Sequence, residues 1–566
     1  MRLYRFSIAP LFWVLLVSIA AAQDSPPPAH LVHDWSNRHI VFAGLTPENL
    51  AEAVGVDPRA WHSWVNHERH RLEPRTDPDP RPIHKGRRHH KQLTTDWQMP
   101  IGNGVGPFAY PAKFTFDVNA APDCANDYVV FPTANSDVPG ASGSGVRASI
   151  VAFNNLYAGL GPTGICPTPP SPATQPSVLF AYNASTTSLG RASHSPALSL
   201  DGKKIAFMES NDGFASNYTA FRVLTWKAGE GTAWSSAAAP GDCSAGNSCM
   251  ATLVLNNAHS DSGSSPFVDY AHDTAYVGDD GGRLHKITPV FSGTPAEVIG
   301  SGWPVQLASS PDIVNSPVYD SVSGRIFTTD NRGNLYVVDG ATGTILKTVS
   351  PVGIFFPSDP IVDSTNQTVF VFGPDTSTNL RVAQFDTSGT LLRALNAGRL
   401  SGDANVYTGA FDNNYYTSPA SGSLYFAGAS NGVASLFSVG FTGNVMNSTF
   451  SGPLTLSTSS TTSAPTPLTE IFNPSFSSAQ DRLFLGIDAN CVSGSSDGCI
   501  ESFDISHGFP SQILNSHTLS TAGTSQSVSG IVIDNVSALA QASSIYFEAT
   551  PNASNSAIKL TQASLQ

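Results

Sequence analysis

The chain has 566 residues, a formal net charge of -14, and only 13% charged residues. This composition excludes a coiled coil and a highly charged disordered chain, and the acidic balance argues against nucleic-acid binding, which needs a basic face. The length exceeds one small core, although all-β folds often run well beyond the usual prior of about 150 residues per domain.

The first expected segment is an export signal over residues 1–22. Arg2 and Arg5 make a positive start, a short apolar run follows, and Ala20 and Ala22 fit the small-x-small rule, which predicts cleavage after Ala22. An uncleaved anchor is the alternative, but the apolar run is short for a membrane span, and no later stretch approaches about 18 apolar residues. The sequence therefore predicts a secreted or periplasmic protein without a membrane span in its mature form.

Residues 23–93 form an arm of different composition, rich in His and Pro. "RHIVFAGL" is expected to be a strand, and "TPENLAEAVGVDPRAWHSWVNHERHRLE" two short helices. Thr46 is a suitable N-cap with Pro47 at the first helical position, and Asp57 precedes Pro58 in the same manner. Trp61 and the neighbouring apolar residues are expected to form a packing face.

Nine of the fifteen histidines lie between His30 and His90. His67 and His70 are three positions apart on an expected helix, and imidazole is a good ligand for zinc, copper and nickel. No carboxylate or Cys at a metal-site spacing completes the set, so we predict no metal site and interpret the arm as a solvated segment. There are two alternatives: the positive charges of the arm dock on the acidic propeller of the same chain, or they bind an acidic surface polymer.

From residue 94 to residue 566 one unit recurs. Related starts are "HSPALSLDGKKIAFMES", "SSPFVDYAHDTAYVGDD", "NSPVYD" and "SDPIVDSTNQTVFVFGP", with weaker versions before and after them. Each start carries a Ser/Asn/Asp-Pro step, and aromatic and β-branched runs separated by polar turns follow, which is typical of strands. Four short antiparallel strands repeated radially indicate an all-β β-propeller. We count eight four-stranded blades, with seven as the alternative.

The last repeat contains only three expected strands, near Gly530, Ile545 and Ala557. The segment "TTDWQMPIG", residues 94–102, precedes the first blade and can supply the fourth. Such pairing would join the two ends of the chain and close the ring.

One unit, "IFTTDNRGNLYVVDGATGTIL", resembles the repeat of the quinoprotein-like β-propeller superfamily, with its "DGxLYAxDxxTG" core, and "YVGDDGGRLHKI" is a degraded second copy. The matching positions are Asp330, Gly333, Leu335, Tyr336, Asp339, Thr342 and Gly343. The resemblance implies the fold. It does not imply pyrroloquinoline quinone, because the Trp that usually closes each repeat, the vicinal Cys pair and a recognisable calcium set are missing. We therefore expect no cofactor.

Six cysteines fit an oxidising compartment and allow fifteen pairings. Local spacing favours Cys243 with Cys249 and Cys491 with Cys499, which leaves Cys124 with Cys166. Cys124 would lie in the first turn of blade 1 and Cys166 in the third. These two turns share one face of the ring, as a disulfide requires.

No nucleophile elbow, P-loop, zinc-protease or EF-hand motif occurs, so the catalytic residues are unknown. "GNGVGP" lacks the Rossmann context, and "DANCVSGSSDG" is interpreted as a disulfide-pinned turn. Asp279 and Asp280 are expected to be turn residues, and His194 and His259 structural ones. Scattered acids such as Asp320, Asp363 and Asp504 lie near strand ends.

Two hypotheses follow. The first is an exported, monomeric, non-catalytic propeller that binds a protein or glycan, or acts as an envelope scaffold. The second is a divergent propeller enzyme, a glycan hydrolase or lyase or an oxidoreductase, with acids gathered at the channel mouth. The first is preferred, because the motifs of known enzymes are missing.

Overall fold

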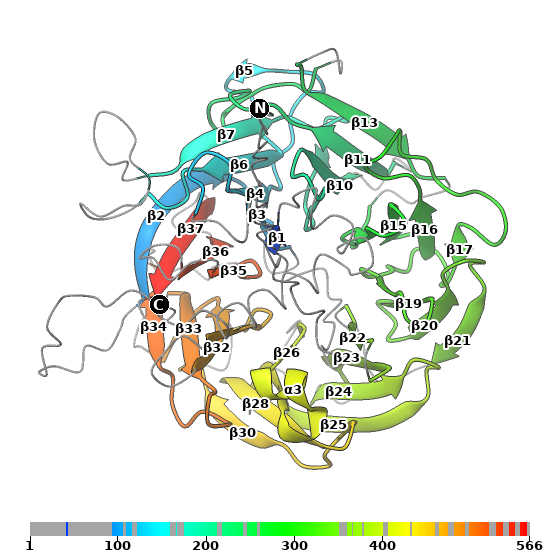
Figure 1. Ribbon diagram of the computed structural model, residues 1–566, viewed down its shortest axis with the longest axis vertical. Helices are drawn as coiled ribbons and strands as arrows, with labels where there is room; N and C mark the ends of the chain where they lie inside the picture. Colours follow the sequence, from blue (N-terminus) through cyan, green and yellow to red (C-terminus); the bar gives the residue numbers. More distant parts are fainter. Residues whose placement is uncertain are drawn as a thin grey trace, which may run out of the picture.

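The computed structural model places eight four-stranded antiparallel blades around a central axis, as the sequence predicted (Figure 1). It describes residues 41–43, 93–105, 109–115, 122–158, 166, 175–211, 218–241, 246–256, 261–349, 359–364, 366–375, 379–399, 406–430, 433–458, 463–473, 480–492, 497–519, 528–535, 543–549 and 555–562. Among these residues, no helix combines the length and hydropathy needed to cross a bilayer.

In blades 1 to 7 the strands run in chain order from the axis outward, whereas in blade 8 the outermost strand is β2, which precedes the first blade in the chain. Blades 1 and 2 contain β3 (Ala112–Thr115), β4 (Tyr128–Pro132), β6 (Ile150–Asn154) and β7 (Ser177–Tyr182), then β9 (Ala197–Leu198), β10 (Lys204–Asn211), β11 (Ala220–Thr225) and β13 (Cys249–Val254). Blades 3 and 4 contain β14 (Phe267–Asp269), β15 (Thr274–Gly278), β16 (Arg283–Ile287) and β17 (Val305–Gln306), then β18 (Val318–Asp320), β19 (Arg325–Thr329), β20 (Leu335–Asp339) and β21 (Ile345–Val349).

Blades 5 and 6 contain β22 (Ile361–Asp363), β23 (Thr368–Pro374), β24 (Asn379–Asp386) and β25 (Leu391–Arg399), then β26 (Ala410–Phe411), β27 (Ser423–Ser430), β28 (Val433–Thr442) and β30 (Ser451–Thr455). Blades 7 and 8 contain β31 (Thr469–Asn473), β32 (Gln480–Ile487), β33 (Cys499–Asp504) and β34 (Asn515–Thr518), then β35 (Val532–Asn535), β36 (Ser543–Ala549), β37 (Asn555–Gln562) and β2 (Leu93–Gly102).

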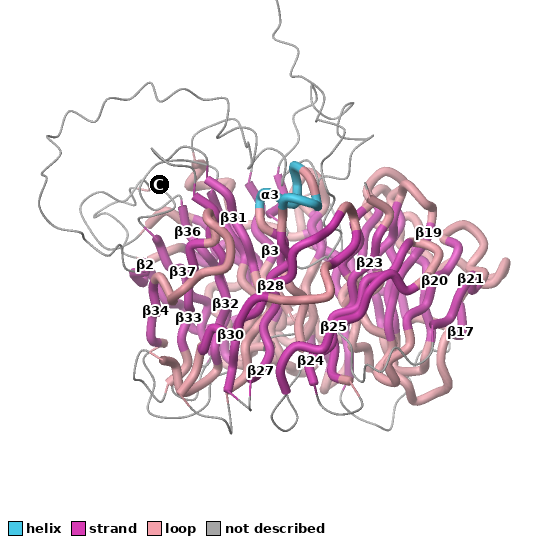
Figure 2. The backbone as a smooth tube through the Cα atoms, turned by 90° about the horizontal axis from the view of Figure 1, so that it is seen from below, coloured by secondary structure: helices cyan, strands magenta, loops and turns pink. Residues whose placement is uncertain are grey.

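The remaining elements decorate the blades. They are β5 (Gly143–Ser144) paired with β12 (Ser236–Ala237), β8 (Gly190–Arg191) on β10, β29 (Val445–Met446) on β28, and the helices α3 (Asn413–Thr417) and η2 (Pro419–Ser421). The two helices lie between β26 and β27, and α3 lies on one face of the ring (Figure 2).

The second and third strands of a blade are buried on both faces, because each blade is covered by its two neighbours. In blade 4, β20 is apolar and buried along most of its length, whereas the outermost strand β21 is largely exposed. One apolar cluster joins Tyr276 of blade 3, Phe327 of blade 4 and Val362 of blade 5. This packing explains why the runs are continuous in β-branched and aromatic residues rather than strictly alternating.

The ring is closed by the strand that precedes the first blade. β2 pairs antiparallel with β37 over nearly its whole length, from Leu93 opposite Gln562 to Gly102 opposite Asn555. Trp97 of β2 is 3% exposed and donates from Nε1 to the Leu156 oxygen of blade 1 at 3.1 Å. The predicted pairing of residues 94–102 with the last blade is therefore confirmed.

The joint between blades 8 and 1 also holds buried ion pairs. Lys113 Nζ lies 3.1 Å from Asp534 Oδ2, and Lys559 Nζ lies 2.9 Å from Asp96 Oδ2, with both ammonium groups fully buried. The ring of Tyr157 lies against both lysines. Buried pairs of this kind contribute little net stability, but removing one partner is costly because it leaves a buried charge without its counter-ion.

The Pro step of the repeat has a structural role. The residue that precedes it donates its backbone N–H to the side chain of the equivalent residue in the next blade. Tyr110 donates to Ser195 Oγ at 2.9 Å and Ser195 to Ser265 Oγ at 3.1 Å. Ser265 donates to Ser316 Oγ at 2.9 Å and Ser316 to Asp359 Oδ1 at 3.0 Å. We call these five residues the inner belt, which links blades 1 to 5.

Of the N-terminal arm the structure describes only β1 (Val41–Ala43), the strand expected in "RHIVFAGL". It pairs in parallel with β3, with Val41 opposite Lys113, and lies near the axis of the ring (Figure 1). The expected export signal, helices and His-rich segment lie outside the described residues.

Candidate functional site

A pocket of about 470 Å³ opens between blades 3 and 4. One wall is the connection from β17 to blade 4, and the other is the turn between β19 and β20 and the start of β20. The lining residues are Gln306, Leu307, Ala308, Ser309, Ser310, Asp312, Asp330, Asn334 and Tyr336. Connections between blades and turns between second and third strands share one face of a propeller, because the strands alternate in direction. We call this the connection face; it includes residues 279–283, 306–312 and 330–334.

Asp330 organises the second wall. Its Oδ1 accepts the backbone N–H groups of Arg332 and Asn334, both at 2.9 Å. Its Oδ2 accepts from Asn334 Nδ2 and from the Tyr336 hydroxyl, both at 2.7 Å. Gly333 has a φ of 87°, a left-handed conformation that glycine adopts without strain. The tight turn thus holds two side-chain polar groups in fixed positions beside the pocket.

Burial, together with the Asp330 carboxylate, raises the pKa of Tyr336 well above its ordinary value. The Tyr336 hydroxyl therefore keeps its proton at neutral pH and donates it to Asp330. Its oxygen retains acceptor capacity. The pocket wall accordingly offers one phenol, one amide and one carboxylate whose orientations are set by one another.

An ion pair joins the first wall to the turn of the second. Arg332 Nε lies 2.6 Å from Asp312 Oδ1, and the Arg332 side chain is 65% exposed. The side chain of Gln306 donates to the Gly281 oxygen at 2.9 Å, which ties the connection to the neighbouring turn of blade 3. Arg332 is not among the lining residues, so its guanidinium group adjoins the pocket through Asp312. The planar donors of a guanidinium group suit carboxylate and hydroxyl oxygens.

The same aspartate turn recurs in blades 3 and 5. Asp279 Oδ1 accepts from the N–H of Gly281 at 2.9 Å and of Arg283 at 2.7 Å. Asp375 accepts from the N–H of Asn379 at 2.7 Å and from its side chain at 2.8 Å. Asp279 is thus a turn residue, as expected.

In blade 3 the position of Tyr336 is taken by His285. Its Nε2 lies 3.2 Å from Asp279 Oδ2 and its Nδ1 2.6 Å from Glu297 Oε1, and the ring is fully buried. Burial alone would lower the pKa of His285, but the two carboxylates raise it above the ordinary value. This imidazole is enclosed within the blade and is not among the residues that line the pocket.

Asp280, the neighbour of Asp279, lies on the connection face beside Asp261. Its backbone N–H donates to the Asp261 oxygen at 3.2 Å, and its Oδ1 accepts from the N–H of Gly263 at 3.2 Å. Burial, with repulsion from the Asp261 carboxylate, raises the pKa of Asp280 to about 7. Beyond its expected role in the turn, this carboxyl therefore keeps its proton to a higher pH than an ordinary aspartate does.

Two of the three expected disulfides are described. Cys124 is bonded to Cys166 across 42 residues, and Cys491 to Cys499 across 8. Cys249 is also disulfide-bonded, while Cys243 lies outside the described residues. The argument that the first and third turns of blade 1 share a face is confirmed by the first of these bonds.

The other candidate residues do not gather at the pocket. Asp320 and Asp363 end the innermost strands of their blades and accept N–H groups of the following turns, as from Val322 at 3.1 Å and Asn366 at 2.9 Å. Asp504 forms an ion pair with Arg482. His194 Nδ1 lies 3.1 Å from Ser193 Oγ, and His259 lies outside the described residues.

The pocket itself was not predicted. Its second wall is the unit that resembles a quinoprotein repeat, so the Asp330, Asn334 and Tyr336 pattern was visible. Its first wall, residues 306–312, carries no motif. Its contact with the turn follows only from the packing of blade 3 against blade 4.

These features define the chain as an eight-bladed β-propeller with a polar pocket on its connection face. No family model matches the chain, and no curated protein matches it. The chain is similar in fold to the computationally designed Ika8 protein, at 13% identity and a TM-score of 0.44, over 83% of this chain and 100% of that one.

The Dos1 propeller aligns at 12% identity and a TM-score of 0.42, over 82% of this chain and 95% of that one. The WD40 domain of Toxoplasma gondii coronin aligns at 12% identity and a TM-score of 0.36, over 83% and 87%. These similarities concern the fold alone.

Proposed function

We propose that this protein is an exported, non-catalytic binding propeller that holds a glycan ligand in the pocket between blades 3 and 4. The observation that carries the proposal is the pocket wall in which Asp330 fixes Asn334 and Tyr336, together with Asp312 of the other wall and its ion pair with Arg332. Preorganised polar groups bind without the entropy cost of ordering flexible side chains.

A glycan is favoured over a protein partner by the chemistry of the lining. Carboxylate, amide, phenol and hydroxyl groups pair well with sugar hydroxyls, and few large apolar side chains line the pocket. Protein interfaces usually centre on buried aromatic or aliphatic anchors. The disulfides are consistent with an oxidising compartment, which supports export together with the leader expected over residues 1–22.

The proposal is tested on a glycan array with the purified protein and two matched arginine variants. Arg332→Ala removes the guanidinium donor beside the pocket, whereas Arg147→Ala removes another surface arginine, 44% exposed, that pairs with Asp137 at 3.6 Å on another blade. We expect Arg332→Ala to weaken binding at least about tenfold, as loss of a charge-assisted hydrogen bond does, and Arg147→Ala to leave it unchanged. Glycan binding that both variants retain, or no glycan binding at all, refutes the proposal.

A second candidate, a glycan hydrolase or lyase, rests on Asp280. A carboxyl whose pKa is raised to about 7 beside a second carboxyl, here Asp261, resembles the arrangement that general-acid catalysis uses. Hydrolysis of a glycan panel that Asp280→Asn abolishes would establish this activity. Turnover that persists in Asp280→Asn would exclude this pair as its source.

A further inference from the structure

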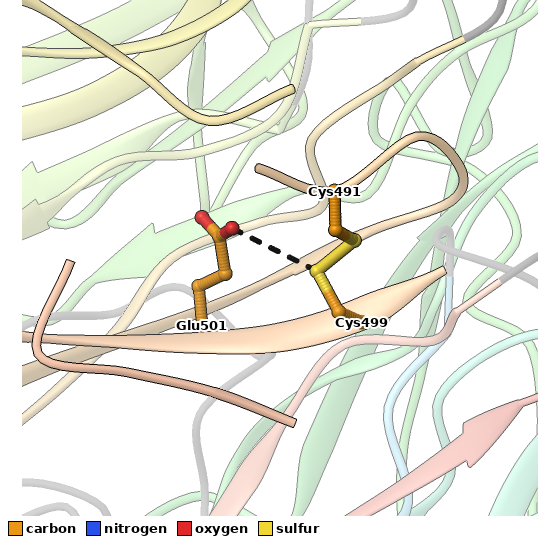
Figure 3. A group of neighbouring side chains, drawn as sticks. All are labelled: Cys491, Cys499 and Glu501. Atoms are coloured by element: carbon orange, nitrogen blue, oxygen red, sulfur yellow. Dashed lines mark hydrogen bonds between the residues drawn. A yellow bond between two sulfur atoms is a disulfide. The ribbon is translucent and has the colours of Figure 1, made fainter. Parts of the chain in front are cut away.

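Glu501 lies beside a disulfide in the interior of blade 7. It follows Cys499 by two positions on β33, so the two side chains lie on the same face of the strand. In Figure 3 the carboxyl group of Glu501 points toward the sulfur of Cys499, and its Oε1 lies 3.7 Å from Cys499 Sγ. Cys491, bonded to Cys499, precedes the turn that leads into the strand.

Glu501 is paired with Leu485 of β32 on one side and with Ser516 of β34 on the other. The Glu501 side chain is 0% exposed, and the face it shares with Cys499 and Phe503 belongs to a cluster that includes Leu485 and Ile487. Its Oε2 has no hydrogen-bond partner among the described residues. Burial raises its pKa to about 8.

An acid in such a place costs stability. A buried polar atom without a partner costs about 1–3 kcal/mol, and Gln or Met would fill a similar volume without the ionisable group. The carboxyl therefore points to a partner that is acquired in another state of the site. The neighbouring sulfurs offer that state, because they change from a weak acceptor to strong anionic ligands when the disulfide opens.

We propose that reduction of the Cys491–Cys499 disulfide converts these two cysteines and Glu501 into a binding site for Zn²⁺. One ligand atom from each of the three residues lies within 4.8 Å of the others. Two thiolates and one carboxylate are ligands that zinc accepts, with water in a fourth position. Zinc would supply the positive charge that the buried carboxyl lacks.

The steps balance as follows. A dithiol reductant transfers two electrons and two protons to the disulfide, which gives two thiols and the oxidised cyclic reductant. Zn²⁺ then replaces the protons of both thiols and of the Glu501 carboxyl, so binding releases three protons when all three groups start protonated. The complex carries one net negative charge. Val492, next to Cys491, is 42% exposed, so the disulfide lies close below the surface.

The test uses the purified protein, reduced with dithiothreitol and transferred to metal-free buffer near pH 7 without oxygen. ZnCl₂ is titrated into it while zinc binding and proton release are followed. The double variant Cys491→Ala/Cys499→Ala retains the remaining cysteines, so zinc held by those thiols is subtracted. We expect the reduced protein to bind one Zn²⁺ more than this variant and the oxidised protein to bind none at this site.

Glu501→Gln tests the carboxylate as a ligand. We expect at least about tenfold weaker zinc binding and the release of two protons instead of three. Glu548→Gln is the matched control, because Glu548 in blade 8 is 2% exposed with a pKa raised to about 8 by burial, yet its Oε2 accepts from the N–H of Val105 in the segment between β2 and β3. It should bind zinc as the unsubstituted protein does.

Three results overturn the proposal: a disulfide that stays closed under native reducing conditions, equal zinc stoichiometry in the reduced protein and the double Ala variant, or unchanged affinity in Glu501→Gln. If the double variant does not fold, Co²⁺ replaces it as the readout. Thiolate-to-cobalt charge-transfer absorption that weakens in oxidised protein supports the site, and its absence from reduced protein refutes it.

Discussion

The inner belt makes a quantitative prediction about the Pro step of the repeat. Ser265 Oγ accepts the backbone N–H of Ser195 from the preceding blade at 3.1 Å, and Ser265 donates its own N–H to Ser316 at 2.9 Å. Ser265→Ala removes the acceptor and leaves the second bond in place. The substitution therefore isolates one link between blades 2 and 3.

The magnitude follows from burial. Ser195 is 4% exposed and Ser265 0% exposed, so water cannot take the place of the lost oxygen. An unpaired buried N–H costs about 1–3 kcal/mol. The alanine side chain brings no compensating contact, because the hydroxyl leaves a space smaller than a water molecule. We expect the free energy of unfolding to fall by about 2 kcal/mol.

Urea denaturation measures this loss as a shift of the midpoint at an unchanged slope. Hydrogen exchange measures it locally, because the Ser195 amide should exchange faster. Ser321→Ala is the control: Ser321 is an exposed turn residue of blade 4, and its substitution should stay within about 0.5 kcal/mol. A change below about 0.5 kcal/mol for Ser265→Ala, with unaltered exchange at Ser195, would show that the belt does not stabilise the ring.

Two further predictions concern ring closure and pH. Trp97→Ala should lower the free energy of unfolding by about 3–5 kcal/mol, because the Trp97 ring packs against those of Phe153 and Tyr546, with ring centroids 6.0 Å and 5.9 Å apart. Gln98→Ala, at an exposed position of the same strand, should change this free energy by about 0.5 kcal/mol or less. Similar urea midpoints for the two variants would contradict the closure argument. The pKa of Glu501 is raised by burial from its ordinary 4.5 to about 8, so the stability that the neutral acid contributes is complete below the lower value and is lost as pH rises toward the upper one. Relative to Glu501→Gln, the oxidised protein should lose about 1.4 kcal/mol per pH unit between the two values, and parallel pH profiles of the two proteins would contradict this.

The sequence was sufficient to predict the ring because the propeller is built from local signals. The runs at residues 325–329 and 368–372 coincide with β19 and the start of β23. The missing fourth strand of the last repeat was itself a signal, since an unpaired edge requires a partner and residues 94–102 were unassigned. The pairing of Cys124 with Cys166 followed from turn positions alone.

The features that the sequence did not reveal depend on contacts between blades. The Pro step was visible, but that Ser265 accepts a hydrogen bond from Ser195 depends on the rotation between neighbouring blades. Glu501 was one acid among many, since only the packing of blade 7 shows it beside a disulfide, with an Oε2 that has no hydrogen-bond partner in the described part of the chain. Similarly, residues 306–312 carry no signature and acquire a role only by facing Asp330.

The three turn aspartates show how one repeat diverges in function. In blade 3 both ring nitrogens of His285 lie against carboxylates, Nε2 against Asp279 and Nδ1 against Glu297. In blade 4 the corresponding Tyr336 has a single carboxylate partner, and the connection from blade 3 stands away from it, which leaves a pocket. The chemistry of the turn is the same in both blades. What differs is the feature beside the turn. In blade 3 it is the carboxyl of Glu297, from the segment between β16 and β17 of the same blade, and in blade 4 it is the pocket lined by the connection from blade 3.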